Sequence, residues 1–467
     1  MRSMMKKDSA VRLTMFALLA ISLAFATVCR AQAQTQTDAS QPSAADLAKR
    51  IDDLEKELDA LKSQMAAQPA AAAPAAPAAA AATSAPAPAA PAAPTIASLL
   101  GPTTISGFVD AYYGYNSNQP ISRTTALRNF DINSSQFGLN MIELVADKSP
   151  DPAASHVGYH VALGFGQAMN LVNSTETPSP HAPGTPVGAV PSTITNFDQY
   201  LKEGYLEYLV GKKLQINVGK FVTPAGAEVI ESKDNWNYSR GLLFSWAIPY
   251  FHFGMNAKYT FNSKFSLTGY LVNGWNDSVD NNSGKTTGFS AAWTPNAKWS
   301  LTENYLVGPE QFNDNADFRN LTDTVLAYTP NAKLSLMANY DYGHDHVPNF
   351  VTTGYNSTVW WSGIAGYIKY APNDKWYLAT RGEWFNDHNG FETGTAQQLG
   401  EWTLTAQRML ASKIMARLEY RRDMSDHNVF PYRNSDLGSP LSPFGPVGSQ
   451  NTITLGMIYA FSSADAK

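Results

Sequence analysis

Two groups of charged residues have the types and spacing to act on ions or polar solutes rather than to make or break bonds. The first group alternates with apolar residues in two segments and comprises Arg381, Glu383, Arg417, Glu419 and Arg421. The second group lies within the aromatic-rich segment 221–251 and comprises Glu228, Glu231, Lys233, Asp234 and Arg240. Fixed charges that face water set ion preference. Both signs occur, so neither group defines a preference for anions or cations.

The first group is positioned by segments in which apolar and polar residues alternate. After Lys375, Trp376 and Leu378 share one face of the chain, whereas Arg381 and Glu383 fall on the other. A period of two indicates a β-strand with one apolar face. The charged side chains are therefore expected to point away from the apolar surroundings.

A recurring turn separates these strands. It is found at residues 261–265, 294–299, 329–334 and 371–376, and in a looser form at 410–414. Its lysines are 34, 35, 42 and 38 residues apart, and they are Lys264, Lys298, Lys333, Lys375 and Lys413. Self-similarity of this kind predicts repeated β-hairpins.

Tight turns alternate with longer polar connections such as 276–285 and 308–320, which is typical of outer-membrane barrels. Strands of about ten residues have the length to cross a bilayer at a tilt of roughly 45°. A β-propeller or a sandwich is the soluble alternative. A propeller blade, however, fits four short strands into a period of about 40 to 50 residues, whereas two long strands fill the period here.

Tight turns are expected near residues 150, 211, 262, 296, 331, 373 and 411, and they join fourteen strands. Segments 103–116 and 451–461 add a first and a last strand. The third strand is expected at 156–169 and the eighth at 286–294. The predicted fold is therefore all-β, a closed antiparallel transmembrane β-barrel of about 16 strands.

Glu303 does not fit the alternation, because the frame set by Lys298 places it on the apolar face. A charge near mid-membrane would cost at most about 2 to 4 kcal/mol. Either a bulge shifts this strand, or Glu303 lies in a contact between subunits.

A barrel of about 16 strands is too wide for its own side chains to fill, so a water-filled interior is expected. Segment 171–196 is rich in Pro, Ser and Thr and is expected to be an external loop. Segment 221–251 mixes charged and large apolar residues, which favours packing against the barrel wall with its charges toward a channel. A solvated external loop is the alternative for this segment.

The N-terminal residues 1–33 have the pattern of an export signal: basic residues, an apolar run at 13–28, and an Ala-Gln-Ala cleavage pattern at 31–33. The apolar run is too short to span a membrane as a helix. Cys29 could suggest lipoprotein processing, but the residue before it is the wrong size for that site. We expect the mature chain to begin at Gln34 and to contain no cysteine.

Residues 34–65 are predicted to form a periplasmic arm, with heptad spacing at 46–65 that indicates a short coiled coil. Three-chain association would bury its apolar seam, and a single amphipathic helix on another surface is the alternative. Residues 66–102 are rich in Ala and Pro and predict an extended linker before the barrel at 103–467. The arm could contact peptidoglycan or another periplasmic component.

Motifs for enzymatic or cofactor chemistry are missing from the sequence. The glycines at 164–169 lack the third member of a nucleotide-binding motif and fall in an expected strand. His344, Asp345 and His346 are interpreted as a polar external loop rather than a metal site, and 277–282 lacks calcium-loop spacing. We therefore predict no enzyme, cofactor or metal. A formal net charge of -5 argues against nucleic acid binding.

Three stretches, 105–120, 130–148 and 223–255, resemble the OmpL-like family of β-barrel porins, and the resemblance covers roughly 103–461. It implies a Gram-negative outer-membrane pore for small solutes. Glu228, Asn235, Arg240 and Pro249 match the family pattern, but the resemblance assigns no role to them.

These observations predict a homotrimeric outer-membrane porin that lets small hydrophilic solutes or ions diffuse passively and that contacts outer-membrane lipid. The alternative is a structural outer-membrane anchor or adhesin, in which the barrel displays loops and a periplasmic arm without significant conductance.

Overall fold

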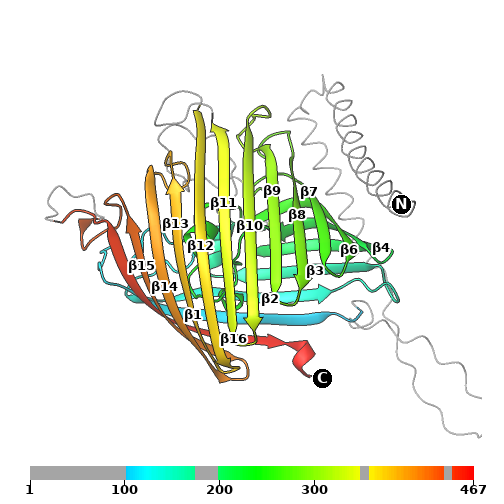
Figure 1. Ribbon diagram of the computed structural model, residues 1–467, viewed down its shortest axis with the longest axis horizontal. Helices are drawn as coiled ribbons and strands as arrows, with labels where there is room; N and C mark the ends of the chain where they lie inside the picture. The colour runs from blue at the N-terminus through cyan, green and yellow to red at the C-terminus, as the bar shows by residue number, and fades with distance from the viewer. Residues whose placement is uncertain (1–100, 174–197, 348–356, 436–443, 467) are drawn as a thin grey trace, which may run out of the picture. The chain divides into compact units, whose positions relative to one another are not determined.

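The computed structural model describes residues 101–173, 198–347, 357–435 and 444–466. The predicted signal, coiled coil and nearly all of the linker lie outside the described residues and stay predictions. Sixteen antiparallel strands form a closed barrel (Figure 1). Among the described residues, no helix has the length and apolar character needed to cross a membrane.

Each strand pairs with its neighbours in sequence, and β1 closes the barrel on β16. The predicted fold class and strand number are confirmed. The strands are β1 (Thr104–Asn116), β2 (Gln136–Lys148), β3 (Val157–Phe165), β4 (Leu201–Val210), β5 (Leu214–Val222), β6 (Phe251–Asn262), β7 (Phe265–Val272), β8 (Thr286–Asn296), β9 (Trp299–Pro309), β10 (Phe318–Asn331), β11 (Leu334–Val347), β12 (Ser357–Asn373), β13 (Trp376–Asp387), β14 (Gln397–Ala411), β15 (Ile414–Ser425) and β16 (Ser449–Ser462).

The recurring turn has a local cause in its asparagine. The side-chain oxygens of Asn262, Asn296, Asn331 and Asn373 each accept the backbone N–H two residues later, at 2.8 to 2.9 Å. An asparagine that bonds its own backbone in this way favours a tight turn. These turns gather at one end of the barrel, and the longer connections gather at the other, as the sequence predicts.

The strand faces follow the predicted alternation. Leu378 is 52% exposed on the outer face of β13, whereas Arg381 on the inner face is fully buried. Trp376 and Trp384 also face outward near the strand ends, as an interfacial aromatic belt requires. Trp275 does not belong to this belt, because it is 7% exposed, lies in a loop, and its ring packs against Trp361.

Two local predictions are wrong. The third strand ends at Phe165, because Gly166 adopts φ 109°, a conformation open to glycine, and turns the chain into helix α4 (Gln167–Val172). The glycine-rich stretch therefore ends in a helix rather than in a strand. His344–His346 lies within β11 rather than in a loop, and the alternation of the strand places Asp345 on the opposite face from both histidines.

Glu303 faces outward without any bulge. β9 keeps a continuous register with β10 from Trp299 to Pro309, and Glu303 lies opposite Thr324. The Thr324 hydroxyl donates to the Glu303 carboxylate at 2.7 Å. A register shift therefore does not explain this residue.

Candidate functional site in the barrel interior

Residues 223–250, between β5 and β6, fold into the barrel and are called the inner loop. The loop is closed at its base, where the Thr223 N–H donates to the Tyr250 carbonyl at 3.0 Å. It contains two short helices, η2 (Ser232–Asp234) and α5 (Leu242–Trp246). Its contacts with inward-facing side chains of the wall hold it in the interior.

Apolar packing fixes α5 against β12. Trp361 donates its indole N–H to the Ala247 carbonyl at 3.0 Å, and Leu243 is buried beside Gly363. A Cβ at Gly363 would lie 2.7 Å from the Leu243 side chain, so the missing side chain makes room for the helix. The large apolar residues of the inner loop thus serve to attach it to the wall.

Arg381 on β13 joins the wall to the inner loop through charge. Its guanidinium donates to Glu228 at 2.6 Å, to Glu401 on β14 at 2.7 Å and to the Ser239 carbonyl at 2.7 Å. Arg381 and Glu401 are shielded from solvent, and such a buried group requires its partners.

The two arginines of β15 bind backbone carbonyls of the loop. Arg417 donates to the carbonyls of Asn235 at 2.9 Å and Asn237 at 3.2 Å. Arg421 donates to the Arg240 carbonyl at 2.6 Å and pairs with Asp423 at 2.6 Å. These contacts fix the loop backbone in place.

Carboxylates of the wall accept N–H groups from the same loop. Glu419 accepts from the backbone of Tyr238 at 2.5 Å and of Ser239 at 3.0 Å, and Glu383 accepts from the backbone of Leu242. Asp110 on β1 accepts the Tyr238 hydroxyl at 2.9 Å. Burial holds the pKa of Tyr238 well above its ordinary value, so this hydroxyl stays a donor.

The predicted site residues therefore divide into buried residues that contact one another and residues that stay partly exposed to solvent. All five wall residues (Arg381, Glu383, Arg417, Glu419, Arg421) point inward, and Glu228 and Arg240 are buried among them. Glu231 pairs with Lys202 on β4. Lys233 and Asp234 remain partly open, with side chains 25% and 55% exposed, and they pair with each other at 2.5 Å.

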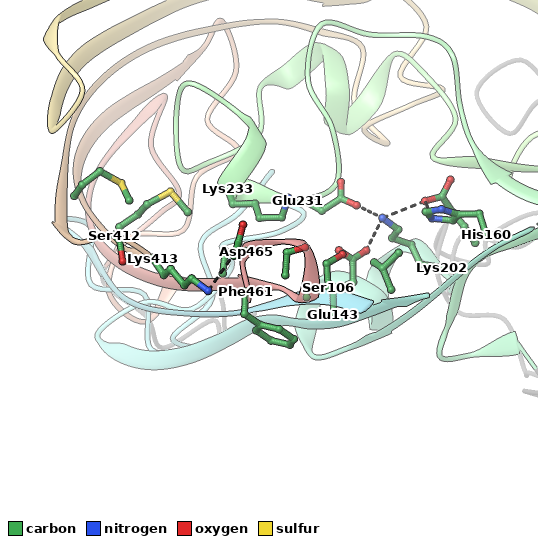
Figure 2. Close-up of a pocket in the computed structure, with 17 residues that line it drawn as sticks. Ser106, Glu143, His160, Lys202, Glu231, Lys233, Ser412, Lys413, Phe461 and Asp465 are labelled. Carbon is green, nitrogen blue, oxygen red and sulfur yellow. Dashed lines mark hydrogen bonds and ion pairs between the residues drawn. The ribbon is translucent and has the colours of Figure 1, made fainter. Parts of the chain in front are cut away.

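Sequence reasoning missed a second cluster around Lys202. Its ammonium contacts Glu143 at 2.5 Å and Glu203 at 3.2 Å as well as Glu231, and His160 lies beside the group (Figure 2). The cluster lines a cavity of about 650 Å³ at the short-turn end of the barrel. Strict alternation would place the consecutive residues Lys202 and Glu203 on opposite faces of β4. A register shift in β4 instead turns both side chains toward the interior.

Metal chemistry finds no support in the described part of the chain, where no group of three or more His, Cys, Asp or Glu side chains could hold an ion. The interior instead presents charges of both signs in mutual contact. A closed 16-stranded barrel with an apolar outer belt and a polar interior has the architecture of an outer-membrane channel.

The chain belongs to the family described as "Putative beta-barrel porin-2, OmpL-like", whose model matches residues 102–461. The expected family is confirmed, and the protein is an outer-membrane porin. No match was found among curated protein sequences.

The chain is similar to several solved structures at low identity. An anion-selective porin from Comamonas acidovorans is 10% identical, with a TM-score of 0.49 over 77% of this chain and 99% of its own. The outer-membrane channel DcaP of Acinetobacter baumannii is 11% identical, with a TM-score of 0.47 over 77% and 97%. OmpT of Vibrio cholerae, in a trimer form, is 12% identical, with a TM-score of 0.47 over 77% and 99%.

Proposed function

We propose that this porin is a passive diffusion channel for small hydrophilic solutes, narrowed by the inner loop. The observation that supports the proposal is the attachment of residues 223–250 to inward-facing side chains of the wall. The loop fills part of the interior, so the remaining cross-section limits the size of a solute.

The contacts of the inner loop are one-sided. Its hydrogen bonds and ion pairs reach β1, β4 and the strands from β11 to β15, as described for Asp110, Lys202, Arg381 and Arg417. Among the described residues, no hydrogen bond or ion pair links the loop to interior side chains of β5 to β9. We assign the open passage to the side formed by these strands.

Single-channel recording in planar bilayers tests the proposal. Purified full-length protein is expected to give stable conductance steps. A variant with residues 226–247 replaced by a short Gly-Ser linker is expected to give larger steps, because the obstruction is removed. A deletion that left conductance unchanged would contradict the constriction. A correctly folded protein without any conductance would favour the structural anchor or adhesin instead.

We further propose that the porin is a homotrimer in which the outward face around Glu303 contacts a neighbouring subunit. A carboxylate between the two aromatic belts is costly in lipid, whereas a subunit contact can supply polar partners. The outward neighbours of Glu303 on adjacent strands are small or polar, namely Ala291 and Thr324. Small residues allow two walls to approach closely. The predicted coiled coil at 46–65 would support the same three-chain assembly.

The Glu303→Leu variant distinguishes a subunit contact from lipid. If Glu303 lies in the interface, its replacement is expected to lower the temperature at which trimers dissociate on semi-native gels. Leu418→Ala, an outward change on the distant β15, is the control and is expected to leave this temperature unchanged. An unchanged trimer with a more stable barrel in Glu303→Leu would place Glu303 in lipid.

A further inference from the structure

Most charges of the interior are unavailable to a passing ion. Arg381, Arg417 and Arg421 are at most 1% exposed, and each is bound to carboxylates, loop carbonyls or both. Lys233, which is partly exposed, is paired with Asp234. The wall residues that first suggest an ion site thus bind the inner loop, and the ion preference has to come from elsewhere.

The opposite wall is lined by neutral polar groups. One rung across β5, β6, β7 and β8 consists of Gln215, Lys258, Thr268 and Ser290. The register along these strands is continuous at this depth. Gln215, Thr268 and Ser290 are half-buried, so this part of the wall is open to water.

Lys258 is the exception in that wall. The alternation of β6 turns Ala257 and Tyr259 outward, and Tyr259 is 40% exposed in the outer belt. Lys258 therefore points inward, and its side chain is exposed. Among the described interior side chains of β5 to β9, two carry a formal charge. Lys220 on β5 is fully buried and pairs with Asp198 at 2.7 Å, whereas Lys258 is exposed. No carboxylate in the described part of the chain forms an ion pair with it.

Other interior charged side chains near the passage are buried or in contact with other residues, so they are less accessible to a passing ion. Glu207, an inward carboxylate on β4, keeps its charge, but it is largely buried and accepts the Gln215 amide at 2.8 Å. Lys369 on β12 also faces inward, but its ammonium lies over the Trp236 ring at 4.9 Å, on the side that the inner loop covers. Lys258 is thus the exposed cation that an ion in the open passage meets.

We infer that Lys258 sets the ion preference of the channel and makes small hydrophilic anions pass more readily than cations. A fixed charge in a water-filled passage with low-dielectric walls concentrates ions of the opposite sign. At roughly 10 Å in water, one unit charge changes the local concentration of a monovalent ion about twofold. The inference rests on the proposed pore with its passage along β5 to β9.

The reversal potential in a KCl gradient measures this preference directly. The unchanged protein is expected to favour chloride. Lys258→Gln is expected to lower the chloride-to-potassium permeability ratio about fourfold, because one unit charge raises chloride and lowers potassium by about the same twofold factor. Lys258→Glu changes two unit charges and is expected to lower the ratio about sixteenfold. Lys264→Gln removes the same charge from the adjacent β6–β7 turn, outside the passage, and is expected to leave the ratio unchanged.

The outcomes separate this inference from the proposed function. Folded protein without conductance would overturn the pore itself. Normal conductance with an unaltered permeability ratio in Lys258→Glu would overturn the role of Lys258 while leaving the pore intact. An equal shift in Lys264→Gln would also overturn it, since a general surface charge would then explain the preference. Heat-modifiable migration on gels verifies that each variant is folded.

Discussion

The guanidinium of Arg381 shares its donors between the barrel wall and the inner loop. It binds Glu401 from the wall, and Glu228 and the Ser239 carbonyl from the loop. A buried ion pair is weak evidence for stability, but removal of one partner leaves the other charge buried and unpaired. Arg381 is therefore one of the wall side chains that couple the wall to the loop.

Arg381→Ala is expected to lower the free energy of unfolding by about 3 to 5 kcal/mol, because Glu228 and Glu401 lose their shared partner. Urea unfolding of the protein in detergent micelles measures the change. Arg408→Ala is the matched control: Arg408 lies on the outer face over the Trp376 ring, at 5.0 Å, and its loss is expected to cost at most about 1 kcal/mol. Equal losses in the two variants would contradict the coupling.

Two carboxyls in the long connections are expected to make that end of the barrel sensitive to pH. Burial raises the pKa of Glu310 from 4.5 to about 7, and that of Glu392 from 4.5 to about 8, although the nearby Arg319 opposes both shifts. The folded state then keeps protons that the unfolded state loses. Local stability is therefore highest below about pH 4.5 and falls as the pH rises toward about 7 to 8.

Amide hydrogen exchange in residues 274–286 and 387–397, corrected for the intrinsic rate, measures this effect. Protection is expected to be greater at about pH 5 than at about pH 8. Glu310→Gln, which mimics the protonated form, is expected to weaken the pH dependence in 274–286. Identical pH dependence in the variant would show that Glu310 is not responsible.

At the scale of the element, the attachment of α5 to β12 depends on one glycine. A Cβ on Gly363 would lie 2.7 Å from the Leu243 side chain and 2.9 Å from the Trp384 carbonyl oxygen. Gly366, on the same strand, has no atom within 4 Å of such a Cβ. The two glycines therefore form a matched pair with different surroundings.

Gly363→Ala is expected to destabilise the protein by about 1 to 3 kcal/mol through overpacking and to loosen the inner loop. Gly366→Ala is expected to be neutral or slightly stabilising. Thermal unfolding measures both, and limited proteolysis within 223–250 reports the loop. A loop cleaved no faster in Gly363→Ala than in Gly366→Ala would contradict the role of this packing.

The strands were predictable from sequence to a greater extent than the contacts of the inner loop. Alternation and the Asn-based turns are local signals, so they located all 16 strands and the inward face of Arg381 and Glu419. Their partners in the inner loop are more than a hundred residues away along the chain, as in the bond from Arg381 to Glu228. No local pattern encodes such a pairing. The register shift that brings Lys202 inward is likewise set by neighbouring strands rather than by its own sequence.

At the scale of the whole molecule, the two halves of the interior have different tasks. The strands from β11 to β15, together with β1 and β4, hold the inner loop through buried polar and charged groups. The strands from β5 to β9 instead present mainly neutral groups, and their exposed interior charge is Lys258. The outer face is also not uniform, because Glu303 interrupts its apolar belt. Stability, permeation and assembly are therefore expected to respond to different mutations, as the variants of Arg381, Lys258 and Glu303 would show.

The pairing of β1 with β16 has a kinetic consequence. The two strands lie at opposite ends of the barrel sequence, so their pairing closes the longest segment of chain. Of all the strand pairings, this one therefore costs the most conformational entropy. The helical turn η4 (Ser463–Ala466) reinforces this junction, because Ser463 accepts the Ile105 N–H of β1 at 3.0 Å. On the other side of β16, Asp465 pairs with Lys413 in the β14–β15 turn at 3.3 Å. Contacts made after the rate-limiting step govern unfolding rather than folding. Removal of residues 463–467 is therefore expected to shorten the lifetime of the folded barrel in denaturant while leaving its folding rate nearly unchanged.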